Sequence, residues 1–106
     1  MLKSKEKEIV QRFKERVTET FGDRLDRVVL FGSRARGDAE PDSDFDFLVT
    51  VRTLKKEDRN RVREIASDLS LEYDTVITVL LSPSKDCRED RYFYLYENIQ
   101  KEGQVV

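Results

Sequence analysis

Two aspartates separated by one residue, Asp44 and Asp46, stand at the start of an apolar run and are the strongest candidates for chemistry in the chain. Because side chains alternate across a strand, both carboxylates are expected on one face, with their Cα atoms about 6.5–7 Å apart. Two such carboxylates repel each other unless a divalent cation takes oxygen ligands from both. The pair therefore predicts a Mg²⁺ site, and two ions about 3.5–4 Å apart are expected, as in many phosphoryl-transfer sites.

A second group of candidate residues, Gly32, Ser33, Arg34 and Arg36, follows the short apolar run 28–31. A glycine lets the backbone come close to a phosphate, and Ser33 offers a hydroxyl and an N–H at the start of a helical turn. The two arginines can neutralise a triphosphate. These four residues are therefore predicted to bind a nucleotide, bridged by the metal to the aspartates.

Two alternatives apply to this stretch. Gly32 and Gly37 have the four-residue gap of a P-loop, but Asp38-Ala39 stands where that motif requires Lys followed by Ser or Thr. The sequence therefore does not match the P-loop motif. An isolated Asp-x-Asp is usually only a polar turn before an exposed strand residue. The order of strand, Gly-Ser, ten residues and Asp-x-Asp before a second apolar strand favours a functional site.

Composition excludes several classes of function. The chain has 106 residues and no histidine, so His-based triads and His-ligated metals are excluded. The formal net charge of −2 argues against nucleic-acid binding, which needs a basic excess. No apolar run is long enough to span a membrane, and one cysteine, Cys87, cannot form an internal disulfide. A single cytoplasmic domain covering residues 1–106 is expected.

Hydrophobic periodicity predicts the elements that position these residues. Helices are expected at 1–21 and 56–71, and a last helix starts at Ser82-Pro83 and ends at Gly103. Strands are expected at 28–31, 45–51 and 75–81, with a short edge strand at 104–106, and Ser33 is expected to cap a helical turn over 34–36. The fold class is α+β, with helices packed against a small sheet, and the pattern leaves strand direction open.

The last predicted helix carries an aromatic run, residues 92–96. Tyr92, Leu95 and Tyr96 are expected to pack inward. Phe93 and Tyr94 either join that packing or remain outside as anchors for a partner.

Gly32-Ser33, the Arg36-Gly37-Asp38 turn and Ser43-Asp44-Phe45-Asp46 together resemble the signature of the minimal nucleotidyltransferase (MNT) family. This family is a compact branch of the DNA polymerase β-like nucleotidyltransferases. The likeness covers nearly the whole chain. It implies a palm-like fold with a small mixed sheet, and ATP as the substrate.

The resemblance also implies a site of three carboxylates, a pair on one strand and a third on a neighbouring strand. Asp44 and Asp46 match the pair. Asp74, at the head of the expected strand 75–81, is the best candidate for the third acid by position, with Glu72 as the fallback. The alternative for Asp74 is a strand-end residue that caps a turn.

No second domain with an acceptor pocket is recognised in the chain, so the acceptor is expected on a partner. Small MNT proteins resemble the antitoxins of HEPN–MNT toxin–antitoxin pairs, in which AMP passes from ATP to a tyrosine of the HEPN ribonuclease. The expected function is therefore that of a type VII-like antitoxin in a hetero-oligomer with a HEPN toxin. The alternatives are a binding subunit without catalysis, and a nucleotidyltransferase subunit that modifies a small molecule such as an aminoglycoside.

Overall fold

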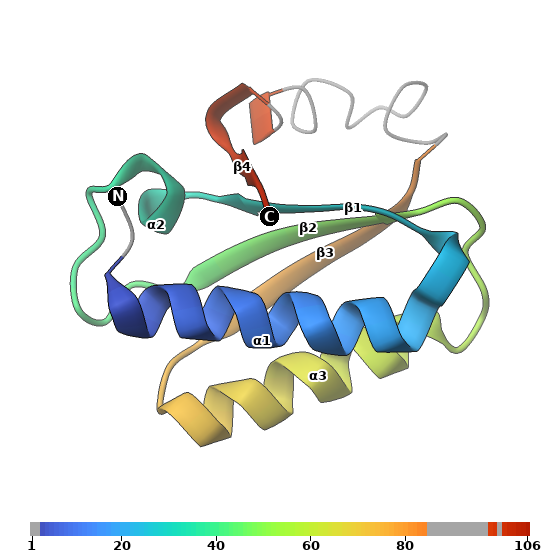
Figure 1. Ribbon diagram of the computed structural model, residues 1–106, viewed down its shortest axis with the longest axis horizontal. Helices are drawn as coiled ribbons and strands as arrows, with labels where there is room; N and C mark the ends of the chain where they lie inside the picture. Colours follow the sequence, from blue (N-terminus) through green and yellow to red (C-terminus); the bar gives the residue numbers. More distant parts are fainter. Residues whose placement is uncertain (1–2, 85–97, 100) are drawn as a thin grey trace.

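The computed structural model describes residues 3–84, 98–99 and 101–106 and shows a small sheet with two long helices on one face (Figure 1). In chain order the elements are α1 (Ser4–Phe21), the 3₁₀ turn η1 (Gly22–Arg24), β1 (Leu25–Phe31), α2 (Ser33–Arg36), β2 (Phe45–Val51), α3 (Asp58–Tyr73), β3 (Ile77–Pro83) and β4 (Gln104–Val105). None of the helices among the described residues is long and apolar enough to cross a membrane.

The sheet has the strand order β3-β2-β1-β4. β1 runs antiparallel to both β2 and β4, whereas β2 and β3 are parallel. A parallel pair needs a long crossover, and α3 supplies it between β2 and β3. The expected α+β class with a small mixed sheet is confirmed, and the crossover helix decides the strand directions that the pattern left open.

Alternation along β2 sorts its side chains between two layers. Phe45, Phe47, Val49 and Val51 belong to the main core beneath α1 and α3, where the Phe13 ring of α1 stacks on Phe47 with centroids 4.0 Å apart. Leu48 faces the opposite side, in a smaller cluster with residues of β1 and the C-terminal segment. Asp46 has the same parity as Leu48 and therefore lies on the side of the sheet without long helices.

A buried ion pair sets the start of α3. The Arg24 guanidinium donates to both oxygens of Asp58, at 2.7 and 3.1 Å, and the Lys55 N–H donates at 2.7 Å. The Asp58 side chain is fully buried. The hydrogen bonds from Arg24 lower the pKa of Asp58 and outweigh the burial that would raise it. This pair ties the beginning of the crossover helix to η1.

Several boundaries differ from expectation. α3 and β3 each begin and end two residues later than predicted, and β1 begins three residues earlier. Ser82 and Pro83 belong to β3 and do not start a helix; β3 is an edge strand, where a proline lacking an N–H is tolerated. Most of that predicted helix, including Cys87 and the aromatic run 92–96, lies outside the described residues.

The end of the chain follows the prediction more closely. Residues 98–99 and 101–102 are helical, and the Gly103 N–H donates to the Ile99 carbonyl at 2.7 Å. The expected edge strand is confirmed as β4.

Candidate active site

Asp46 lies where three strands meet. In the register of the sheet its neighbours are Phe31, the last residue of β1, and Thr78 of β3. Asp46 is half-buried, and Asp44, one residue before β2, is exposed. Both acids therefore lie at the end of the sheet where β1 passes into the Gly32 turn.

Gly32 packs directly against the Asp46 carboxylate. Its backbone has φ 75° and ψ −159°, a region open essentially only to glycine. A Cβ added at this position would lie less than 3.0 Å from Oδ2 of Asp46, which real Cβ atoms essentially never show. The Gly32 backbone therefore lies close to the Asp46 carboxylate, and its approach to a phosphate stays a prediction.

Thr78 is a site residue that sequence reasoning missed. Its hydroxyl donates a hydrogen bond to Oδ1 of Asp46. Together with Gly32 beside Oδ2, this contact holds both oxygens of Asp46 in a defined orientation. Thr78 lies 32 residues from Asp46 along the chain, and only the parallel register of β2 and β3 brings them together.

Ser33 is the first residue of α2, and Gly32, not Ser33, is the N-cap; within the described part of the chain no side chain caps this helix. The Gly32 carbonyl accepts the N–H groups of Ala35 and Arg36, both at 3.1 Å. The Gln104 side-chain amide donates to the Ala35 carbonyl at 2.9 Å, so β4 holds α2 in place. The Ser33 N–H and hydroxyl are thus at the helix start that follows the turn over Asp46.

The two arginines of α2 have different environments. The side chain of Arg34 is only 10% exposed; it pairs with Glu6 at 3.1 Å and donates to the Ser43 carbonyl at 2.8 and 3.2 Å. Its guanidinium also lies 4.4 Å from the centroid of the Phe45 ring. Arg34 thus holds the loop that leads to Asp44, and its contact with a nucleotide stays a prediction. Arg36 is half-exposed, with an ion pair to Asp38 at 3.4 Å, and remains accessible to a phosphate.

Glu6 is a second residue that sequence reasoning missed. The Lys3 N–H donates to its carboxylate at 2.8 Å, and this bond, together with Arg34, lowers the pKa of Glu6 although burial opposes the shift. The first turn of α1 is thereby joined to the loop before Asp44. Glu6 lies 28 residues from Arg34 in the sequence, so no local motif marks the contact.

The structure does not bring the expected third carboxylate to the pair. Asp74 is the C-cap of α3, exposed and left-handed with φ 50°, and β3 begins three residues later. Glu72 lies in the helix layer, 3.8 Å from Arg12 of α1. Asp is one of the few residues that tolerate this backbone conformation, so it ends the helix and does not begin the strand.

Among residues 3–84, 98–99 and 101–106, no group of three or more Asp, Glu, His or Cys side chains could hold a metal ion. The β3 position opposite Asp46 carries Thr78. Mg²⁺ typically takes one or two protein carboxylates and completes its shell with phosphates and water, so Asp44 and Asp46 still fit one such ion together with a nucleotide. The second expected ion needs ligands from elsewhere.

Comparison with known proteins places this geometry in a family. The sequence model of the nucleotidyltransferase domain family matches residues 7–106, and the chain belongs to this family. The Methanocaldococcus jannaschii protein named "Putative protein adenylyltransferase MJ0141" is 43% identical over 77 residues, which are 70% of this chain and 76% of the relative. A second protein of the same organism and the same kind of name, MJ0604, is 26% identical over 95% of this chain and 97% of its own length.

Solved structures support the fold. A structure described as a minimal nucleotidyltransferase candidate superposes with a TM-score of 0.65 and 20% identity, covering 94% of each chain. A toxin–antitoxin structure with AMP-PNP superposes with a TM-score of 0.62 and 20% identity, covering 88% of this chain and 68% of that one. The predicted family and fold are confirmed, and the chain is assigned to the nucleotidyltransferases as an enzyme class.

Proposed function

We propose that this chain is a Mg²⁺-dependent adenylyltransferase that transfers AMP from ATP to a tyrosine hydroxyl of a HEPN toxin, and that it acts as the cytoplasmic antitoxin of that pair. The observation that carries the proposal is the Asp44 and Asp46 pair beside the Gly32 turn. The names of the relatives, which describe adenylyl transfer to proteins, support it. A fold shared with a toxin–antitoxin protein bound to AMP-PNP is consistent with it.

In this proposal each site residue has a distinct role. Asp44 and Asp46 hold Mg²⁺, which when bound neutralises charge on the triphosphate and on the transition state. Gly32, Ser33 and Arg36 bind the phosphates. Arg34 acts as a positioning residue through the loop before Asp44.

The transfer is an in-line displacement. The acceptor oxygen forms a bond to the α-phosphorus, the bond from that phosphorus to the bridging oxygen breaks, and pyrophosphate leaves with that electron pair. Because Asp44 and Asp46 are needed for the cation, the acceptor proton passes to water or to a group on the partner. The chain contributes orientation and charge stabilisation.

A second candidate, a binding subunit that masks its partner without chemistry, is favoured by one observation. The position opposite Asp46 carries Thr78, and among the residues that the structure describes no third acid joins the pair. A site with two acids has weaker cation binding and no obvious base. The two candidates differ in whether the partner gains mass.

The test first asks whether a neighbouring gene encodes a small helical protein with the Arg-x4-His motif of HEPN ribonucleases, and then mixes that protein with this chain, ATP and Mg²⁺. We expect the partner to gain about 329 Da for each AMP transferred, as judged by intact-mass spectrometry. Asp44→Ala and Asp46→Ala are expected to abolish the gain, whereas Asp42→Ala, an exposed acid of the same loop, keeps it. A tight complex without any mass gain would support the binding subunit instead.

A further inference from the structure

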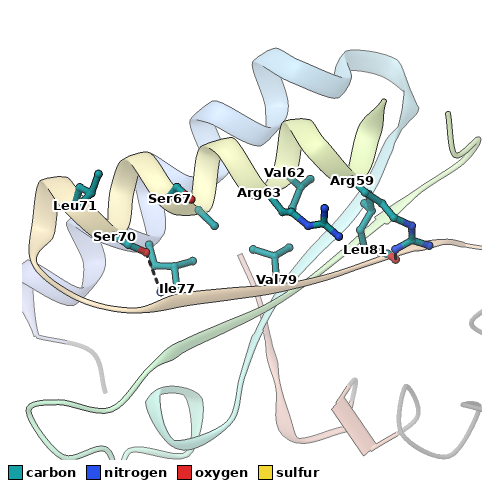
Figure 2. Close-up of a pocket in the computed structure, with 10 residues that line it drawn as sticks. Arg59, Val62, Arg63, Ser67, Ser70, Leu71, Ile77, Val79 and Leu81 are labelled. Atoms are coloured by element: carbon teal, nitrogen blue, oxygen red, sulfur yellow. Dashed lines mark hydrogen bonds between the residues drawn. The ribbon is translucent and has the colours of Figure 1, made fainter. Parts of the chain in front are cut away.

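A large groove lies between α3 and β3, and Asp46 is not among the residues that line it (Figure 2). It has a volume of about 600 Å³. Its floor is apolar, formed by Val62, Ile77, Val79 and Leu81. Leu71 lines one end with 84% of its surface exposed, so it adds apolar surface to that end of the groove.

β3 is the edge strand of the sheet, so one side of its backbone has no strand partner among the residues that the structure describes. Strand alternation directs the N–H and C=O groups of Ile77, Val79 and Leu81 outward, because the Val76 carbonyl bonds Phe45 at the start of β2. Two outward groups are capped by α3: the Ser70 hydroxyl accepts from the Ile77 N–H at 3.1 Å, and Arg59 donates to the Leu81 carbonyl at 3.2 Å.

The two caps leave the middle of the edge open. Among the described residues no side chain or backbone group is recorded as bonding the N–H or C=O of Val79. The open groups are the N–H and C=O of Val79, the C=O of Ile77 and the N–H of Leu81. Together they form a short hydrogen-bonding edge. An open edge of this kind pairs readily with another strand.

The groove has opposite charge at its two ends. Arg59 and Arg63 line the end beside Leu81, and no carboxylate of the described residues lies within ion-pair distance of either. At the other end, past Leu71, α3 closes with exposed Asp74, and the helix C-terminus adds partial negative charge.

This distribution is self-complementary. Ser70 reaches Ile77 and Arg59 reaches Leu81, so Val79 lies midway between the basic end and the acidic end. An antiparallel copy rotated about Val79 places the basic end of each chain against the acidic end of the other. A peptide that carries only negative charge would complement the basic end of the groove but not the acidic end.

We propose that a second copy of this chain occupies the groove, forming a two-fold dimer in which β3 pairs antiparallel with β3 about Val79. Val79 of each copy exchanges two hydrogen bonds with its equivalent, and the Leu81 N–H of each copy donates to the Ile77 carbonyl of the other. The Leu71 side chains become covered, and the small residues Ala66, Ser67 and Ser70 let the two α3 helices approach.

The dimer extends the sheet across two chains and leaves the catalytic face open. Asp46 contacts Thr78, whose side chain points to the opposite face of β3 from Ile77 and Val79. A partner that supplies an acceptor can therefore reach Asp44 and Asp46 in each copy. The inference is independent of the proposed adenylyl transfer, because it concerns a surface that the reaction does not use.

The test measures molar mass by light scattering and sedimentation for the full chain without nucleotide. We expect a dimer of the 12.5 kDa chain at micromolar to tens of micromolar concentration. The charge-reversed variant Arg59→Glu/Arg63→Glu and the variant Leu71→Arg are each expected to weaken the dimer at least about tenfold, because like charges then meet at both contacts. Val79→Pro, which removes the central N–H on an edge strand, is expected to be monomeric.

The decisive step mixes the two charge variants. The acidic end created by Arg59→Glu/Arg63→Glu faces the new arginine of Leu71→Arg, so the mixture is expected to form heterodimers more tightly than either variant forms homodimers. Circular dichroism confirms that each variant is folded. A monomeric wild type, a dimer insensitive to all three variants, or a mixture that stays monomeric would each overturn the proposal.

Discussion

Replacement of Gly32 by alanine tests the contact on which the candidate site depends. The new methyl group has to displace the Asp46 carboxylate or the turn itself, because its Cβ would lie less than 3.0 Å from Oδ2. Alanine also has to adopt φ 75° with ψ −159°, a region that side chains avoid. The two effects are separable because another glycine in the chain shows only the second.

That matched control is Gly22→Ala. Gly22 has φ 54° and ψ −127° at the end of α1, and a Cβ added there would meet nothing within 4 Å. Backbone strain should cost each variant about 1–3 kcal/mol. Overlap with Asp46 should add about 1–3 kcal/mol in Gly32→Ala alone. The free energy of unfolding, measured with urea, should therefore fall by about 2–6 kcal/mol for Gly32→Ala and by about 1–3 kcal/mol for the control.

The functional consequences should differ more sharply than the stabilities. A displacement of Asp46 by about 1 Å is enough to lower the rate of transfer on the order of 100-fold, whereas Gly22→Ala should keep the wild-type rate per folded molecule. A double-mutant cycle with Asp46→Ala isolates the contact without relying on activity. In that background the extra cost of Gly32→Ala should vanish; if it persists, the contact with Asp46 is not its cause.

Three further predictions concern residues that the tertiary structure singles out. Arg34→Ala should lower the free energy of unfolding by about 2–3 kcal/mol, because the loop before Asp44 loses the hydrogen bonds that hold it. The same variant should reduce Mg²⁺–nucleotide binding measured by calorimetry, whereas Glu6→Gln should keep most of the binding. Equal binding by Arg34→Ala and wild type would contradict the positioning role. Asp58→Asn should cost about 3 kcal/mol at pH 7 in urea unfolding. The pKa of Asp58 lies below its ordinary value of 3.8, so its stabilisation is present above about pH 4 and is lost as the pH falls through the native pKa. The difference in free energy of unfolding between wild type and Asp58→Asn should therefore narrow near about pH 3. A constant difference would exclude this linkage. Thr78→Asp should place a third acid beside Asp46, so that thermal stability falls without Mg²⁺ and rises more steeply with added Mg²⁺ than in wild type; an unchanged response to Mg²⁺ would show that Thr78 does not adjoin the cation site.

The sequence by itself determined much of this protein. A continuous apolar run, a Gly-Ser turn and an alternating strand are local patterns, and they located β1, α2 and β2 together with Asp44 and Asp46. The absence of histidine also limited the chemistry before any fold was known. These features depend only on neighbouring residues, so periodicity and residue type are enough to recognise them.

Only the tertiary structure decided which side chains lie beside Asp44 and Asp46. Asp74 and Thr78 are only four residues apart, but a helix that runs two residues further than its pattern indicated leaves Asp74 at the cap and places Thr78 opposite Asp46. For Arg34, the position beside Ser33 predicts a phosphate ligand, but only the tertiary structure shows its contact with the distant Glu6. Strand register and contacts across 28 or more residues are set by how the helices pack on the sheet, and no local pattern carries that information.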